Sequence, residues 1–228
     1  MCIDDNEHNE ELNMRMLLPQ RHRLLHGYPM SIWMDRVEPG VRAPLALEET
    51  RPLLVGVLPH SSCNPRVKGC GFCTFPHERF RKEDVLQVVR GVCEEIHQSA
   101  DRLPNLQQKR VDGLYFGGGT ANLTPAPAFE RLCRVLGSHF DFSQAEATLE
   151  GVPRYFSKGD YELLRIMMDH LPARHHRVSM GVQSFDVDYI KMMGRQAFGD
   201  FKDISAVIGF AHEMEMTVSL DLLINLPG

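Results

Sequence analysis

From Leu53 onward, short apolar runs alternate with longer segments of helical periodicity, and no other feature limits the possible folds as much. A short continuous apolar run indicates a buried strand, whereas apolar residues recurring every three or four positions indicate an amphipathic helix. The expected strands are Leu53–Leu58, Val111–Phe116, Ala145–Leu149, Val178–Val182 and Thr217–Leu226. The expected helices are Lys82–Ser99, Pro127–Leu136, Tyr161–His170, Val187–Met193 and Phe201–Met214. This alternation is typical of βαβ units and predicts an α/β fold with parallel strands, either an open barrel or a doubly wound sheet.

Some local features refine this prediction. Leu53–Leu58 is continuous in apolar residues, which predicts a strand buried on both faces. Cys93 and Cys133 lie on the apolar faces of their helices, and we interpret both as small buried hydrophobic residues. The pair His175-His176 is expected in a solvated loop between a helix and a strand.

The first 50 residues lack the alternation, and we interpret them as an N-terminal extension packed on a core domain of residues 51–228. The sequence ends on the turn signal Pro227-Gly228 directly after the last expected strand. A further unit would ordinarily follow such a turn. We therefore expect that the chain is truncated at its C-terminus.

Composition describes a soluble globular protein, with 43% apolar residues, 24% charged residues and a formal net charge of −5 in 228 residues. No long run of positive charge indicates a nucleic-acid surface, and no apolar run approaches the roughly 20 residues that span a bilayer. The polar N-terminus is unlike a secretory signal, and six cysteines are too few for a secreted disulfide framework. We expect a cytoplasmic protein without nucleic-acid or membrane partners.

Three cysteines, Cys63, Cys70 and Cys73, fall within eleven residues directly after the first strand. Cys70 and Cys73 have the Cys-x-x-Cys spacing that lets two thiolates reach one metal centre. Three thiolates without an obvious fourth partner suit a [4Fe–4S] cluster with one open iron. A zinc site completed by His60 or His77 is the alternative, because imidazole is an ordinary fourth ligand of zinc.

The residues at the expected strand ends are polar or lack a side chain. The second strand ends in Gly117-Gly118-Gly119-Thr120, the third in Glu150 and the fourth in Gln183, and the fifth carries Asp221. Sites in parallel α/β proteins form where the carboxyl ends of the strands meet. Three consecutive glycines also let a ligand approach the backbone, although a tight turn favours glycine too. The sequence therefore predicts a site at this rim, beside the three cysteines.

The cysteine cluster, Tyr115-Phe-Gly-Gly-Gly-Thr120, Gly181-Val-Gln-Ser-Phe185, Gly194-Arg195 and Asp221-Leu-Leu-Ile-Asn-Leu-Pro-Gly228 occur in this order. As a set they resemble the radical S-adenosylmethionine (SAM) superfamily, nearest to the branch of oxygen-independent coproporphyrinogen III oxidase. The first spacing departs from that branch, being Cys-x6-Cys-x2-Cys in place of Cys-x3-Cys-x2-Cys. The resemblance implies a partial (β/α) barrel of about five units, with three cysteines binding a [4Fe–4S] cluster.

The resemblance also implies a binding site for SAM. Gly117, Gly118 and Gly119, followed by Thr120, match the motif that meets the SAM amino group through backbone carbonyls. The remaining matches, listed with the role each implies, are Glu150 and Gln183 as polar contacts, Arg195 as a nearby basic residue, Asp221 as an acceptor for the ribose hydroxyls and Phe72 as a neighbour of the adenine. These roles agree with the chemistry of SAM, because its carboxylate suits an arginine, its ribose hydroxyls suit an acceptor and its ammonium suits carbonyl oxygens.

The implied activity is reductive cleavage of SAM to a 5′-deoxyadenosyl radical, which abstracts hydrogen from a small-molecule or tetrapyrrole substrate. A reductant such as flavodoxin or ferredoxin is the expected electron donor. The residues themselves identify no catalytic acid or base. Two alternatives within the resemblance are a non-catalytic haem-binding relative, similar to haem chaperones, and a radical SAM methyltransferase.

Overall fold

The computed structural model describes residues 50–64, 70, 72–73, 78–103, 105–224 and 226. The expected N-terminal extension, residues 1–50, and the possible zinc ligand His77 therefore lie almost wholly outside the described residues. Among the described residues, no helix combines the length and apolar character that a membrane crossing needs.

Five strands form one parallel sheet, and their spatial order follows their order in the chain. They are β1 (Leu53–Val57), β4 (Val111–Phe116), β5 (Glu146–Gly151), β6 (His175–Gln183) and β7 (Thr217–Leu222). The helices between them are α2 (Lys82–Arg102), α3 (Ala126–His139), α5 (Glu162–His170) and α7 (Phe201–Glu213). Short elements complete the described part: β2 (Ser62–Cys63), β3 (Glu78–Arg79), α4 (Pro153–Phe156), α6 (Val187–Met192), and the 3₁₀ turns Leu106–Gln108, Ala121–Leu123 and Gln196–Phe198.

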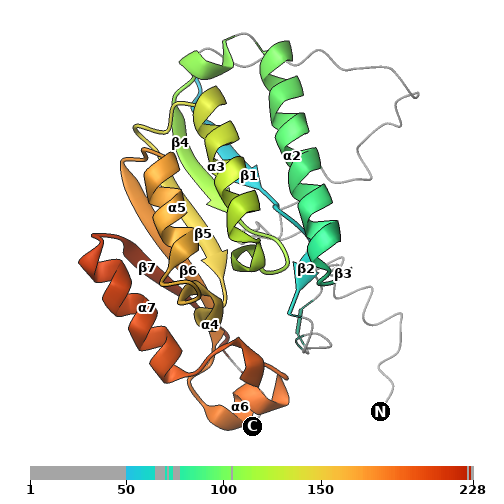
Figure 1. Ribbon diagram of the computed structural model, residues 1–228. Coiled ribbons are helices and arrows are strands. Elements are labelled where there is room, and N and C mark those ends of the chain that lie inside the picture. The colour runs from blue at the N-terminus through green and yellow to red at the C-terminus, as the bar shows by residue number, and fades with distance from the viewer. Residues whose placement is uncertain are drawn as a thin grey trace, which may run out of the picture. The chain divides into compact units, whose positions relative to one another are not determined.

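The strand order β1-β4-β5-β6-β7 never reverses, and this resolves the two architectures that the sequence left open. Parallel crossovers are right-handed, so successive crossovers in one direction put their helices on the same side of the sheet. Figure 1 shows α2, α3, α5 and α7 lying along one face. A doubly wound sheet would require a reversal of direction. The sheet is therefore singly wound, as expected of a partial (β/α) barrel of about five units.

The hydrophobic core lies between the sheet and these helices. Leu114 and Phe116 of β4 and Leu149 of β5 point into it, and Phe116 packs edge-to-face on Phe129 of α3 with ring centroids 5.1 Å apart. Cys93 and Cys133 are fully buried in this core, as expected of small hydrophobic residues.

The opposite face of the sheet is polar. Parallel strand partners share a face, and the pairs Gly113–Glu146 and Thr148–Arg177 place one polar row there. Arg177 binds both Glu146, at 3.1 Å, and the hydroxyl of Thr148, at 3.1 Å. The inner face of the partial barrel is thus lined by charged and hydrogen-bonding groups.

Two local expectations were wrong. The first strand is not buried on both faces, because Leu54 is 82% exposed and β1, within the part of the chain that the structure describes, forms the edge of the sheet beside β4. The histidine pair is not in a loop: His175 and His176 begin β6, where His175 hydrogen-bonds Thr217 at 2.8 Å and His176 the carbonyl of Leu171 at 3.0 Å. Cross-strand and loop contacts thus extend β6 beyond its apolar stretch.

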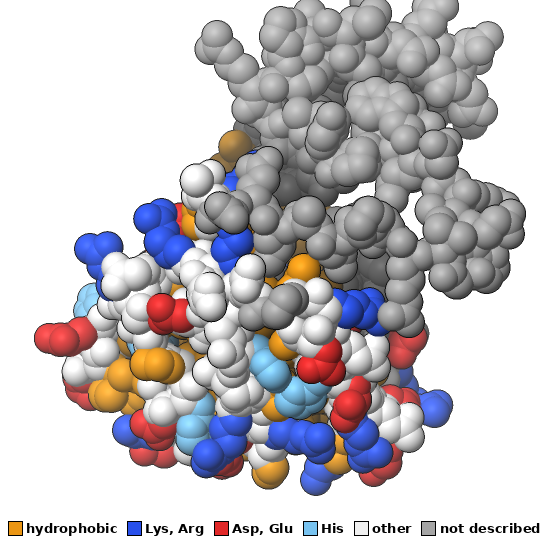
Figure 2. All heavy atoms as spheres, turned by 90° about the horizontal axis from the view of Figure 1, so that it is seen from above, with side chains coloured by type: hydrophobic (Ala, Val, Ile, Leu, Met, Phe, Trp, Pro, Cys, Tyr) orange, Lys and Arg blue, Asp and Glu red, His pale blue; other side chains and the backbone are white. Residues whose placement is uncertain are grey.

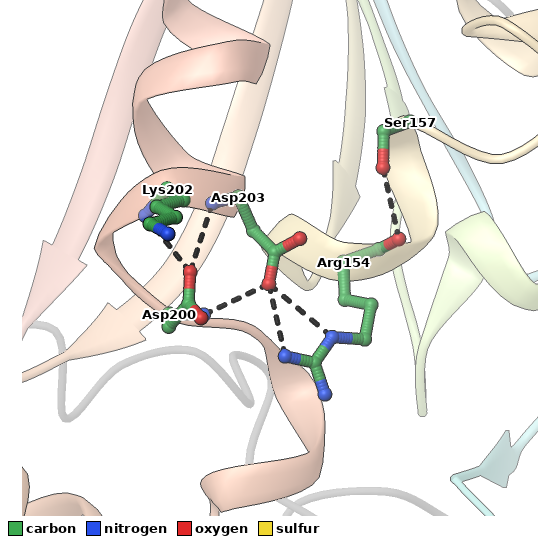
Figure 3. A network of polar contacts seen from close by, with 5 residues as sticks. All are labelled: Arg154, Ser157, Asp200, Lys202 and Asp203. Atoms are coloured by element: carbon green, nitrogen blue, oxygen red, sulfur yellow. Dashed lines mark hydrogen bonds and ion pairs between the residues drawn. The ribbon is translucent and has the colours of Figure 1, made fainter.

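A polar network joins α4, which follows β5, to the start of α7 (Figure 3). Asp200 caps α7 by accepting from the backbone amides of Lys202 and Asp203, and the carboxylate of Asp203 accepts from the backbone amide of Asp200. The same Asp203 oxygen accepts from Arg154 of α4 at 3.1 Å. The network holds α7 against the segment that leaves the carboxyl end of β5.

The face seen from above in Figure 2 looks onto the end of the molecule where α2 ends and β4 begins. Acidic and basic side chains are intermingled on the described part of this face. The polar groups considered below gather at the other end, where the strands finish.

Candidate functional site

A cavity of about 250 Å³ opens at the carboxyl ends of the strands. Its wall contains ten of the residues predicted from the sequence, namely Cys63, Cys70, Phe72, Cys73, Gly118, Gly119, Thr120, Glu150, Gln183 and Arg195. A second, larger cavity of about 440 Å³ is mostly apolar and shares only Gly181, Arg195 and Phe198 with the first. The smaller cavity is therefore the candidate site.

Each of the three thiols is positioned by local structure. Cys63 ends β2, which pairs with β3, and its sulfur lies 3.2 Å from the hydroxyl oxygen of Thr120. The amide of Cys73 donates to the carbonyl of Cys70 at 3.0 Å, which closes a turn around Phe72. This turn presents the Cys-x-x-Cys pair to the cavity wall.

Arg195 is a buried charged side chain at the site, with only 6% exposed. Its Nη1 donates to Cys70 Sγ at 3.0 Å and its Nη2 to the carbonyl of Gly181 at 2.6 Å. The guanidinium lies over the ring of Phe198 at 4.5 Å and near that of Phe72 at 5.9 Å. Its buried Nε has no hydrogen-bond partner among the described residues. The burial of one N–H donor without an acceptor is costly, which indicates that a ligand acceptor completes this site.

The electrostatics of Cys70 reflect this neighbour. Burial raises the pKa of the Cys70 thiol, while the charge and hydrogen bond of Arg195 act in the opposite direction. Neighbouring Cys63 and Cys73 raise the pKa further, because three thiolates repel one another. Three anionic sulfurs would therefore need positive charge among them, which a bound iron cluster supplies.

The glycines after β4 permit close backbone approach. Gly118 has a φ of +120°, in a region that side chains disfavour, and a Cβ there would lie 2.9 Å from the carbonyl oxygen of His60. A Cβ on Gly119 would collide with the carbonyl oxygens of Ser61 and Ser62. These glycines hold the end of β4 against the segment that carries Cys63, in addition to any contact with a ligand.

The side chain of Asn122 fixes the end of β5, and a register shift between β6 and β7 shapes the end of β6. The side-chain amide of Asn122 donates to the carbonyl of Val152 at 2.9 Å and accepts from its amide at 3.2 Å, which fixes the chain just beyond Glu150. The pairing of β6 with β7 shifts register between Gly181 and Gln183, and Gln183 adopts a positive φ of 71°. Such bulges redirect a side chain at the rim of a sheet.

Two predicted residues do not line the cavity. Gly117 is one, and a Cβ at this position would meet the ring of Tyr115 and the carboxylate of Glu150. Asp221 of β7 pairs with Gly181 of β6, which lines the cavity, and the charge of Asp221 contributes to raising the pKa values of Tyr115 and Glu150. Asp221 therefore stands beside the cavity wall.

The cavity also contains residues that the sequence did not single out for binding, namely Ala121, Gly151, Val152, Gly181 and Phe198. Gly181 occurs within the motif Gly181-Val-Gln-Ser-Phe185, so its position in the chain was a usable signal. Phe198 carries no such signal, because its role is to pack on Arg195 and depends on the turn Gln196–Phe198.

The donor set fits an iron–sulfur cluster. Each cysteine of such a cluster binds a different iron, so their sulfurs stand further apart than the ligands of a single ion. Among the described residues, no three histidine, cysteine or acidic side chains are grouped closely enough for one metal ion. His60 does not line the cavity, and burial lowers its pKa to about 4.

No family model matches the chain. Among curated proteins, it is 32% identical over 129 residues to oxygen-independent coproporphyrinogen III oxidase of Escherichia coli K12, covering 55% of this chain and 26% of that protein. It is 29% identical over 160 residues to anaerobilin synthase of E. coli O157:H7, covering 70% and 34%. It is 26% identical over 167 residues to the heme chaperone HemW of Haemophilus influenzae, covering 71% and 41%.

Comparison with solved structures points to the same superfamily. The solved coproporphyrinogen III oxidase HemN from E. coli, described as a radical SAM enzyme, matches with a TM-score of 0.62 and 26% identity over 78% of this chain and 38% of that one. The expected resemblance to the radical SAM superfamily, near the coproporphyrinogen III oxidase branch, is confirmed, as is the expected α/β fold. Relatives of this kind use a [4Fe–4S] cluster and SAM, as the resemblance implied. The chain spans about a quarter to two fifths of the length of these relatives.

Proposed function

We propose that this chain is the catalytic domain of a radical SAM enzyme, in which Cys63, Cys70 and Cys73 hold a [4Fe–4S] cluster beside a bound SAM. The observation that carries the proposal is the convergence of these three thiols, the buried Arg195 and the polar strand ends on one cavity. When bound, the cluster supplies the electron that cleaves SAM reductively to a 5′-deoxyadenosyl radical, which abstracts hydrogen from the substrate.

In this proposal the chain's own groups bind and orient the two cofactors. The positive charge of Arg195 suits the SAM carboxylate, and Glu150 together with the carbonyls of Gly118 and Gly119 suits its ammonium. Asp221 accepts from the ribose hydroxyls, while Phe72 lies near the adenine. Gln183, redirected by the bulge in β6, adds a further polar contact.

The substrate in this proposal is a small molecule or a tetrapyrrole. The named relatives support this class, because coproporphyrinogen, which appears in the name of one of them, is a tetrapyrrole. We also propose a small electron carrier such as flavodoxin or ferredoxin as the reductant, since the cluster needs one electron for each cleavage.

Formation of 5′-deoxyadenosine tests the proposal. Anaerobically reconstituted protein is incubated with dithionite and SAM, and products are separated chromatographically. The unaltered chain should release 5′-deoxyadenosine, whereas Cys70→Ala should release none. Cys93→Ala is the matched control, because this buried core cysteine lies away from the cavity and its loss should leave cleavage intact. Equal product from the unaltered chain and Cys70→Ala would contradict the proposal.

The similarity to HemW, the heme chaperone, supports a second candidate function, a haem-binding domain without turnover. Haem titration separates the two candidates. Stoichiometric haem binding with no 5′-deoxyadenosine would favour the chaperone-like function.

A further inference from the structure

We propose that Tyr115 is a positioning residue for Glu150, and that Gly117 provides the space in which the two side chains meet. This inference rests on the proposed function, in that it gives Glu150 the task of receiving the ammonium of SAM. It assigns a role to Tyr115, which does not line the cavity.

The first observation is a hydrogen bond across two strands. Tyr115 near the end of β4 donates from its hydroxyl to Glu150 Oε2 on β5 at 2.8 Å. Tyr115 is paired in register with Thr148, so its long side chain reaches two residues further along β5 toward the rim. Both side chains lie on the polar inner face, whereas the neighbouring Leu114 and Phe116 are buried under the helices.

The second observation concerns Gly117. A Cβ at this position would lie 2.7 Å from the ring of Tyr115 and 3.0 Å from Glu150 Oε2. Both atoms belong to the far ends of side chains, so another residue at this position would displace the ring of Tyr115 and shift the carboxylate of Glu150 by a few tenths of an ångström. Glycine at position 117 therefore serves this pair, in addition to the backbone approach that the glycine motif permits.

The third observation is the electrostatic balance at Glu150. Burial raises the pKa of the Glu150 carboxyl, and the charge of Asp221 raises it further. The hydrogen bond from Tyr115 is the contribution that favours the ionised form. Burial and the charges of Glu150 and Asp221 raise the pKa of Tyr115, against the effect of Arg177, so the tyrosine remains a protonated donor.

Together these contacts prepare one carboxylate oxygen for a cationic ligand. Oε2 is held by Tyr115, while Oε1 accepts no hydrogen bond from the described residues. Because Glu150 lines the cavity, the geometry leaves Oε1 available to the ammonium group of the amino acid part of SAM. Removal of the tyrosine hydroxyl would free the carboxylate to rotate and would favour its protonated form.

The test compares two ligands that react no further. S-adenosylhomocysteine carries the amino acid group, and 5′-methylthioadenosine lacks it but keeps the nucleoside and the sulfur. Binding is measured by calorimetry on anaerobically reconstituted protein, for the unaltered chain, Tyr115→Phe, Glu150→Gln and the double variant. Tyr161→Phe is the matched control, because it also removes a hydroxyl that hydrogen-bonds, to the carbonyl of Ala206, but far from the cavity.

Tyr115→Phe should weaken S-adenosylhomocysteine binding about tenfold, because Glu150 loses both its fixed orientation and the hydrogen bond that favours its ionised form, and should leave methylthioadenosine binding unchanged. The double variant should bind no worse than Glu150→Gln, since Tyr115 acts through Glu150. Unchanged S-adenosylhomocysteine binding in Tyr115→Phe, or equal losses for both ligands, would overturn the inference alone. Failure of the unaltered chain to bind S-adenosylhomocysteine would overturn the proposed function as well.

Discussion

Arg195 donates a hydrogen bond to the sulfur of Cys70 at 3.0 Å, although 125 positions separate the two residues in the sequence. The contact joins the turn after α6 to the segment after β2. It also brings a buried positive charge against one of the three sulfurs proposed to hold the cluster.

From this contact we predict that Arg195 raises the reduction potential of the cluster. Hydrogen bonds and positive charge near a cluster sulfur stabilise the reduced form, so Arg195→Gln should make the midpoint potential about 60 mV more negative. A redox titration followed by electron paramagnetic resonance measures this shift. Arg154→Gln is the control, because Arg154 pairs with Asp203 outside the cavity. Equal potentials in Arg195→Gln and the unaltered protein would show that the contact does not persist with the cluster bound.

A second prediction concerns the contact of Asp221 with the nucleoside part of SAM. If its carboxylate accepts from the ribose hydroxyls, Asp221→Asn should weaken SAM binding about tenfold and leave the iron content unchanged. Ser219→Ala, two positions earlier on the same face of β7, is the control and should have little effect. Calorimetric binding together with iron analysis gives both values. An unchanged affinity would remove Asp221 from the binding site.

The cap of α7 should contribute measurably to stability. Asp200 accepts from two backbone amides at the start of α7, so Asp200→Ala should lower the free energy of unfolding by about 1 kcal/mol. For a chain of this size, that loss lowers the melting temperature by about 2–4 °C. Ser157→Ala, which removes an exposed 3.3 Å bond to the carbonyl of Arg154, should change it by much less. Equal melting temperatures for all three proteins would argue against the capping box.

His60 should make the stability of the metal-free chain depend on pH. Burial lowers the folded pKa of His60 to about 4 from an ordinary value of 6.5. Between these values the unfolded chain binds a proton that the folded chain does not, so the free energy of unfolding decreases as the pH falls from 6.5 to 4. The full loss is about 3 kcal/mol. Urea unfolding across this range should show the decrease, and His60→Gln should lack this part of it; equal slopes would contradict the burial of a neutral imidazole.

Much of the fold could be predicted from hydrophobic pattern, because the apolar residues of β4, β5 and their helices point to one core. The errors came where tertiary context decides. The apolar run of β1 could not reveal that the strand forms the edge of the sheet, with Leu54 exposed. His175 and His176 are polar, and they join β6 because Thr217 and the carbonyl of Leu171 lie within hydrogen-bond distance.

The location of the candidate site could be predicted from topology, because parallel strands bring their carboxyl ends to one edge of the sheet. What the sequence could not show were the contacts within the rim. The bond from Tyr115 to Glu150 depends on strand register, and the bond from Arg195 to Cys70 depends on two distant loops. The position of Asp221 beside the cavity wall likewise depends on strand register, because Asp221 pairs with Gly181 of β6.

The measurement that tests the proposed cofactor site most directly is electron paramagnetic resonance on anaerobically reconstituted, dithionite-reduced protein, with and without SAM. A reduced [4Fe–4S] cluster with an open iron should give a signal that changes when SAM binds to that iron. A cluster signal that is the same with and without SAM, or the absence of any cluster signal from folded protein, would contradict the proposal that Cys63, Cys70 and Cys73 form a radical SAM site.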